Sequence, residues 1–332
     1  MTENEADTTP YARLTPDLIL DAMEHFGLVT SGHFLALNSY ENRVYQIGLE
    51  DAGFVVAKFY RPGRWSDAAI LEEHEFAQEL VRQEIPMVAP LANEQGETLI
   101  YYEGYRFAVF PRRGGRWPEL EDEDNQLWLG RFIGRIHAVG SIGGFQARPR
   151  FTAKSFGRDN FEWLMESGFI PAELEHNYRQ AGEQVLQQID AAFAELLDMR
   201  MIRLHGDCHP GNILWTDKGP HFVDLDDCMM GPAMQDLWML LSGDSQQMTI
   251  QLRNIVEGYQ EFADFDYSQI RLIEALRSLR LIHYSAWLAR RWHDPAFPHH
   301  FPWFNTPRYW EEQLYTLREQ QEHLMLPVLK LY

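Results

Sequence analysis

The chain has 332 residues, of which 45% are hydrophobic and 13% aromatic, so it can form two packed lobes. Its formal net charge of −20 disfavours partners such as nucleic acid or an anionic membrane surface, because their phosphates repel a negative protein. The first residues are polar and acidic, unlike a signal peptide, and no apolar run reaches the roughly 18 residues of a membrane helix. The two cysteines, Cys208 and Cys228, form no disulfide framework. We therefore expect a cytoplasmic protein.

The first 110 residues combine helix and strand signals. A helix is predicted from Thr15, an N-cap residue followed by proline at the first helical position, to a stop near Gly27. A second helix opens at Ser66. Strands are predicted before and after this second helix, with a turn at 51–53, in the ranges 34–37, 43–49, 54–60, 98–102 and 106–110.

Beyond a linker at 111–115 the sequence becomes mostly helical. Apolar residues recur at helical spacing in five segments, 125–139, 172–199, 250–262, 269–291 and 308–324. A short hairpin is predicted from strands at 213–215 and 221–225. The order indicates an α+β chain with a small sheet lobe at 1–110, a hinge at 111–115 and a larger helical lobe at 116–332.

The stretch His-Gly-Asp-Cys-His-Pro-Gly-Asn contains Asp207 and Asn212, and Asp224 stands at the far end of the predicted hairpin. Phosphoryl transfer from ATP needs a carboxylate that accepts the acceptor's proton and hard oxygen ligands that hold magnesium against the phosphates. The spacing predicts Asp207 as the catalytic base and Asn212 and Asp224 as magnesium ligands, as in the catalytic loop of protein kinases. In contrast to those kinases, Gly206 replaces an arginine and no Asp-Phe-Gly motif occurs.

Two other interpretations of this loop are open. Its acids could merely cap helices on a polar surface loop. A zinc site is a second alternative, with the ligand set His205, Cys208, His209 and Cys228. Their spacing matches no zinc finger or ribbon pattern, so His205 is interpreted as a residue that braces the loop.

Lys58 is the only lysine in the first 150 residues and lies near the end of a predicted strand. Kinases use such a lysine over the ATP phosphates, held by a carboxylate of the following helix. That helix offers Glu72, Glu73 and Glu75, and Glu73 is favoured over Glu72. The alternative is a solvated strand lysine without a role in binding.

A glycine-rich phosphate loop is missing, because residues 38–43 contain no glycine. Backbone N–H groups and small side chains would then contact the phosphates, with Ser39 as the natural candidate. Glu41 would be unfavourable near phosphate unless it points away.

The loop from His205 to Asn212, with Asp224 and Asp236, resembles the aminoglycoside phosphotransferase and choline kinase superfamily. A closer resemblance, to the stress response kinases of bacteria, is carried by residues 37–46, 56–62, 71–74, 107–111, 203–212 and 290–298. It implies a bilobal protein-kinase-like fold, ATP and Mg2+ as cofactors, a monomer, a protein serine or threonine as acceptor, and a part in envelope or oxidative stress survival. It also implies nucleotide contact by Ser39 and the roles given above for Asp207, Asn212 and Asp224.

The remaining polar residues carry weaker predictions. Asp236 is expected to support the catalytic loop by accepting backbone N–H bonds. Asp226 and Asp227 are interpreted as solvated or as neighbours of the metal ligand. His137 is interpreted as a hydrogen-bonded core residue. The aromatic and arginine-containing segment 284–303 is interpreted as core with a polar rim, or as part of an acceptor groove.

Three functions compete on the sequence alone. The first is a serine/threonine protein kinase acting on an unidentified protein substrate. The second is a small-molecule kinase that phosphorylates an amino alcohol or an aminosugar, which the acidic surface would suit. The third is a pseudokinase, disfavoured because the base, both metal ligands and the lysine are all present.

Overall fold

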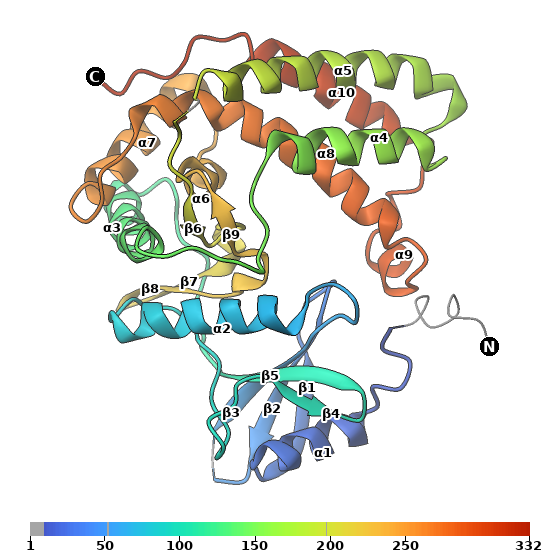
Figure 1. Cartoon of the computed structure of the whole chain (residues 1–332), viewed down its shortest axis with the longest axis vertical. Helices are drawn as coiled ribbons and strands as arrows, with labels where there is room; N and C mark the ends of the chain where they lie inside the picture. The colour runs from blue at the N-terminus through green and yellow to red at the C-terminus, as the bar shows by residue number, and fades with distance from the viewer. Residues whose placement is uncertain (1–9, 52, 197) are drawn as a thin grey trace. The chain divides into compact units, whose positions relative to one another are not determined.

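The computed structural model describes residues 10–51, 53–196 and 198–332 (Figure 1). The acidic N-terminal segment that argued against a signal peptide and Ala52 of the predicted turn lie outside the described residues. Contacts between residues divide the chain into two units. The first comprises Met1–Pro118, Phe145–Arg148 and Gly211–Asp227; the second comprises Glu119–Gly144, Pro149–Pro210 and Cys228–Tyr332.

The first unit is built on an antiparallel sheet with the strand order β1-β2-β3-β5-β4. Its strands are β1 (Thr30–Ala36), β2 (Arg43–Leu49), β3 (Phe54–Phe59), β4 (Ile100–Tyr102) and β5 (Tyr105–Pro111). All five predicted strands are confirmed, although β1 begins four residues earlier than predicted. Lys58 lies on β3 between Val44 of β2 and Ala108 of β5.

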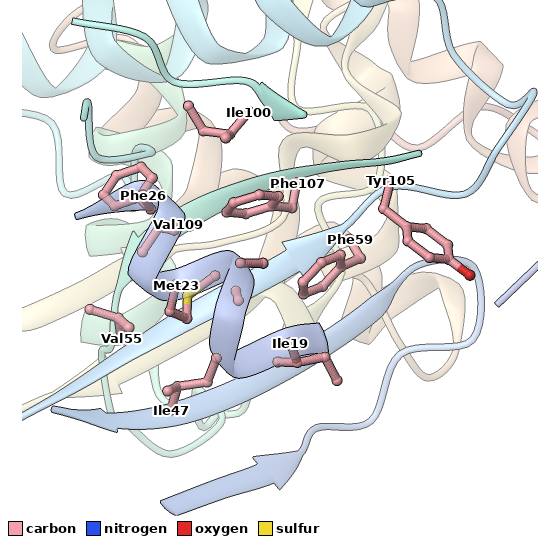
Figure 2. Close-up of a cluster of buried hydrophobic side chains, with 12 residues drawn as sticks. Ile19, Met23, Phe26, Ile47, Val55, Phe59, Ile100, Tyr105, Phe107 and Val109 are labelled. Carbon is pink, nitrogen blue, oxygen red and sulfur yellow. The ribbon is translucent and has the colours of Figure 1, made fainter. Parts of the chain in front are cut away.

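Two helices cover the two faces of this sheet. The helix α1 (Pro16–Phe26) is capped by Thr15, whose hydroxyl accepts the N–H of Leu18, and it ends at Gly27 with φ of 101°. The helix α2 (Asp67–Arg82) is capped by Ser66. Both helices are confirmed with the predicted caps. Because side chains alternate along β5, Phe107 and Val109 join the α1 core (Figure 2), whereas Ala108 packs with Ile70 of α2.

The hairpin of β7 (Ile213–Thr216) and β8 (Gly219–Phe222) belongs to the first unit. Phe222 exchanges backbone bonds with the 86–88 segment, and the N–H of Arg116 donates to the carbonyl of Trp215 at 2.9 Å. The predicted lobes, 1–110 and 116–332, stay a prediction; the contact-based units differ from them by placing this hairpin with the sheet.

One detail of the hairpin prediction is wrong. Asp224 was expected on a strand, but β8 ends at Phe222. Asp224 has φ of 62°, a left-handed conformation that a strand does not accommodate and that aspartate tolerates better than most residues.

The second unit is helical. Its helices are α3 (Glu123–Gly140), α4 (Asp159–Glu166), α5 (Ala172–Ala194), α6 (Met234–Leu237), α7 (Ser245–Tyr259), α8 (Ile273–Arg290), α9 (Ala296–His300) and α10 (Pro307–His323). The five predicted helices correspond to α3, α5, α7, α8 and α10. The short helices α4, α6 and α9 were not predicted, nor was the pairing of β6 (Ile202–Leu204) with β9 (Met229–Gly231).

Helices α3 and α7 pack closely through glycine. A Cβ atom at Gly130 would lie 2.0 Å from the carbonyl oxygen of Ile255, and one at Gly258 would lie 2.1 Å from that of Leu127. Only glycine allows backbones to approach this closely. Elsewhere in this unit, α5 contacts α10 and α4 contacts α8 (Figure 1). Among the described residues, none of the helices combines the length and apolarity required to cross a bilayer.

Candidate active site

The first unit contains a cavity of about 390 Å³ that opens beside the sheet. Five predicted site residues line it: Ser39, Lys58, Glu73 and, at the base of the hairpin, Asn212 and Asp224. Its apolar lining comes from β2, β3 and the 88–90 and 110–111 segments, including Val44, Val56, Val88, Pro90 and Phe110. An apolar slot with a few charged groups at one end is a common form of small-ligand site.

Lys58 is the centre of the charged end. Its Nζ lies 3.3 Å from Oε1 of Glu73, 3.1 Å from Oδ1 of Asp224 and 3.0 Å from Oδ1 of Asp226. Burial lowers the pKa of Lys58, but the three carboxylates outweigh it and hold that pKa well above its ordinary value. The ammonium therefore stays charged. Glu73, and not Glu72, provides the helix carboxylate.

Asp226 and Asp227 were interpreted as solvated or as neighbours of the metal ligand, and Asp226 proves to be a buried part of this cluster with a side chain 5% exposed. Arg64 pairs with Asp226 and lies 2.6 Å from Asp227. Burial raises the pKa of Asp226, but the charges of Arg64, Lys58 and Arg148 outweigh it and lower that pKa below its usual range. Asp226 therefore stays ionised, and its charge stabilises Lys58 in the protonated form.

The pair Asn212 and Asp224 offers hard oxygen ligands of the kind magnesium prefers. The carbonyl of Asn212 accepts the N–H of Val223 at 3.0 Å, which fixes the two ends of the hairpin side by side. The Asp224 side chain is 53% exposed, and Lys58 is the partner of its Oδ1. Magnesium is commonly held by one or two protein oxygens together with phosphate oxygens and water, so a two-residue ligand set fits this ion.

The loop between β1 and β2 lies at the same cavity. Asn38, Ser39 and Asn42 line it. Asn42 is buried, and its Oδ1 accepts the N–H of Arg61 at 3.0 Å, which anchors the loop. Glu41 is absent from the cavity lining; its Oε1 lies 3.6 Å from Nε of Arg61. The carboxylate of Glu41, which would have repelled a bound phosphate, thus faces Arg61 instead.

Asp207 lies in the second unit. Its Oδ1 accepts a hydrogen bond from Nη1 of Arg280 on α8 at 2.6 Å, and its Oδ2 lies 3.5 Å from Nε2 of His209. Burial raises the pKa of Asp207, but Arg280, His209 and His205 outweigh it and hold that pKa below its usual value. The carboxylate is therefore ionised and able to accept a proton near neutral pH.

Asp236 supports the loop that carries Asp207, as predicted. Its two oxygens accept the backbone N–H groups of His205 and Gly206, each at 2.8 Å. Gln235 donates to the carbonyl of Gly206, whose φ of 88° requires glycine. His137, confirmed as a buried and hydrogen-bonded residue, lies 3.0 Å from Asp236. The loop is therefore held through its backbone.

The zinc alternative finds no support in the described part of the chain. No group of three or more histidine, cysteine, aspartate or glutamate side chains in residues 10–51, 53–196 and 198–332 could hold a metal ion. Cys208 and Cys228 are buried thiols, and burial raises the pKa of Cys208 well above its ordinary value. A protonated buried thiol is a poor metal ligand.

Three arginines near these sites were missed by the sequence analysis: Arg64, Arg148 and Arg280. Arg148 is 4% exposed, with Nη1 3.9 Å from Glu73 and Nη2 bonded to the carbonyl of Asp226. The scarcity of lysine singled out Lys58 and gave no indication of these arginines. The abundance of arginine in an acidic chain was an available signal that some arginines neutralise site carboxylates.

Comparisons with known proteins identify the family of this chain. Residues 33–273 match the protein family described as "Phosphotransferase enzyme family". Stress response kinase A of Escherichia coli (strain K12) is 46% identical over 321 residues, covering 97% of each chain. The serine/threonine protein kinase RdoA of Salmonella typhimurium is 44% identical over the same length and coverage.

Solved structures resemble the fold at low sequence identity. The amicoumacin kinase hAmiN, solved with AMP-PNP, Ca2+ and Ami, has a TM-score of 0.73 at 17% identity, covering 98% of this chain and 97% of its own. A microcompartment-associated aminopropanol kinase has a TM-score of 0.70 at 16% identity, covering 95% of this chain and 100% of its own. These likenesses and the two units establish the predicted bilobal α+β kinase fold. The chain belongs to the phosphotransferase enzyme family and, within it, to the family of stress response kinase A.

Proposed function

We propose that this phosphotransferase is an ATP- and magnesium-dependent kinase that phosphorylates serine or threonine side chains of proteins. The observation that carries the proposal is the buried Lys58, held by Glu73 and Asp224 at the charged end of the cavity. A fixed ammonium beside an oxygen ligand pair is what a nucleotide triphosphate requires. The name of the Salmonella relative, serine/threonine protein kinase, supports the class of acceptor.

Each residue then has one task. Lys58 binds the phosphates of the nucleotide, with Glu73 holding its ammonium in place, and Ser39 contacts them from the β1–β2 loop. Asn212 and Asp224 would hold magnesium, which neutralises phosphate charge during transfer. Asp224 would then be shared between the ion and Lys58, and the contacts of Lys58 with Asp226 and Glu73 would keep its ammonium in position.

Asp207 accepts the proton of the acceptor hydroxyl and aligns that hydroxyl for attack. Arg280 fixes the orientation of this carboxylate through the 2.6 Å hydrogen bond. The same guanidinium argues against a cationic acceptor, because an amino alcohol or aminosugar would bring a second positive charge beside it. An acceptor side chain of a protein carries no such charge.

The test is a labelling assay with magnesium, γ-labelled ATP and a generic protein acceptor such as myelin basic protein. We expect label on serine or threonine, with Asp207→Ala lowering turnover by about two to four orders of magnitude at nearly unchanged ATP affinity. Asp224→Ala should instead abolish magnesium-dependent ATP binding. Retained turnover in Asp207→Ala would contradict the base assignment, and unchanged ATP affinity in Asp224→Ala would contradict the ligand assignment.

The small-molecule alternative has its own outcome in the same assay. Absence of label on any protein, combined with ATP consumption that rises with added amino alcohols or aminosugars, would replace the protein-kinase proposal. A cytoplasmic location, a monomeric state and a part in stress survival complete the proposal. The relatives' name supports the last of these, and a deletion strain under oxidative or envelope stress tests it.

A further inference from the structure

Arg290, the last residue of α8, is a cation held by neutral groups. It forms no ion pair with any carboxylate of residues 10–51, 53–196 and 198–332. Several other arginines of the second unit face an acid within 4.0 Å, among them Arg131, Arg158, Arg179, Arg271, Arg277 and Arg308. Asp159, whose charge acts on Arg290, is itself 2.5 Å from Nζ of Lys154. In a chain of net charge −20, an arginine without an ion-pair partner is a candidate site for binding an anion.

Neutral groups hold Arg290 in one place. Its guanidinium stacks over the ring of Trp163 on α4 at 4.6 Å, and its Nη1 donates to Oδ1 of Asn160 at 2.5 Å. Asn160 is 3% exposed. The amide nitrogen of Asn160 donates to the carbonyls of residues 155 and 156 at 3.0 and 2.9 Å and lies 3.1 Å from His283. The guanidinium is therefore oriented without being neutralised, which lowers the entropy cost of binding an anion.

The helix α8 links this guanidinium to the proposed base. Arg280, ten residues before Arg290 on the same helix, donates to Asp207. With a rise of about 1.5 Å per residue, the two arginines stand about 15 Å apart along the helix axis. Between them the half-buried rings of Tyr284 and Trp287 stack at 5.7 Å and form an aromatic surface. An extended peptide covers about 3.3 Å per residue, so the distance corresponds to four or five residues.

We propose that Arg290 is a specificity site for an anionic side chain of the protein substrate, four or five residues from the phosphorylated serine or threonine. The acceptor segment would follow α8, with the acceptor hydroxyl at Asp207 and the anionic side chain on the guanidinium held by Trp163 and Asn160. A carboxylate or a phosphorylated side chain supplies the same chemistry. The inference rests on the proposed protein-kinase function and adds the class of sequence that it recognises.

The experiment uses the full chain and a set of neutral serine peptides. Each peptide carries one glutamate, one phosphoserine or one lysine at a single position, up to six residues on either side of the acceptor. The proteins are the wild type, Arg290→Gln, Arg290→Glu and the control Arg308→Gln, which removes an exposed arginine of α10. Circular dichroism verifies that the variants are folded, and kcat/KM is measured for every peptide.

We expect glutamate at four or five residues on one side to raise kcat/KM about fivefold in the wild type and in Arg308→Gln, the size of an exposed ion pair. Phosphoserine at that position should act at least as strongly if phosphorylated segments are the natural source. Arg290→Gln should lose the preference while keeping its rate on the neutral peptide, and Arg290→Glu should prefer lysine there.

Two outcomes would overturn the inference. One is a preference that survives in Arg290→Gln, and the other is a preference at a different distance or no preference at all. If either outcome is observed while peptides are still phosphorylated, the protein-kinase function is retained and only the specificity site is refuted. If no peptide is phosphorylated by any of the four proteins, the proposed function falls, and the specificity site falls with it.

Discussion

Replacing Asp236 by alanine should unfold the second unit at a much lower temperature. Asp236 is 1% exposed and accepts the backbone N–H groups of His205 and Gly206 at 2.8 Å, with His137 at 3.0 Å. Alanine leaves these donors buried without an acceptor. Each hydrogen bond to a charged group contributes about 1.5–3 kcal/mol, and breaking such a buried cluster costs about 3–5 kcal/mol. For a unit of this size, about 2–4 °C per kcal/mol gives a fall in Tm of roughly 6–20 °C.

Thermal unfolding followed by circular dichroism measures this fall, and Asp244→Ala provides a matched control. Asp244 also accepts two backbone N–H bonds, from Gln246 and Gln247, but as the exposed N-cap of α7. Water can replace that carboxylate, so its loss should cost only about 1 kcal/mol. The reasoning is refuted if Asp236→Ala lowers Tm no more than Asp244→Ala does.

Three other predictions concern different parts of the molecule. Because Arg280 lowers the pKa of Asp207, Arg280→Gln should raise that pKa and move the acid limb of the kcat/KM profile to higher pH; a limb that stays in place would contradict the pairing. Cys208 and Cys228, 1% and 0% exposed, should react with a thiol reagent only after denaturation, and rapid labelling of the native protein would show that their burial is wrong. Gly130→Ala should destabilise the protein by about 1–3 kcal/mol in urea unfolding, because its Cβ would lie 2.0 Å from a carbonyl oxygen of α7; unchanged stability would mean that the helices separate freely.

The parts of the fold that could be predicted from sequence are those whose signals are local. Thr15 and Ser66 cap helices because a hydroxyl one residue before an apolar-periodic segment binds free N–H groups, whatever lies around it. The strands β6 and β9 have three residues each, too few to show a period, and they exist because they pair with each other. Their detection required knowledge of contacts between segments far apart in the chain.

The same division applies to the candidate sites. Asp207, Asn212 and Asp224 could be predicted because phosphoryl transfer requires those residue types at short spacing. Arg280 is 73 positions from Asp207, and no local pattern connects them. The sequence left open whether Asp226 is solvated or a neighbour of the metal ligand, because it does not reveal which of several adjacent acids is buried. The ion pairs with Lys58 and Arg64 show that Asp226 is the buried one.

Two adjacent glutamates on α2 bear on how this enzyme could be regulated. While Glu73 holds Lys58, the carboxylate of Glu72 accepts the N–H groups of Gln146, Ala147 and Arg148 at 2.7, 2.9 and 2.9 Å. A rotation of α2 that released the lysine would therefore also break the three charge-assisted bonds of Glu72, two of them exposed to water and one part-buried. Inactivation by movement of α2 would thus break the contacts of both Glu72 and Glu73. Regulation through access of the acceptor or supply of the nucleotide would leave the contacts of Glu72 and Glu73 intact.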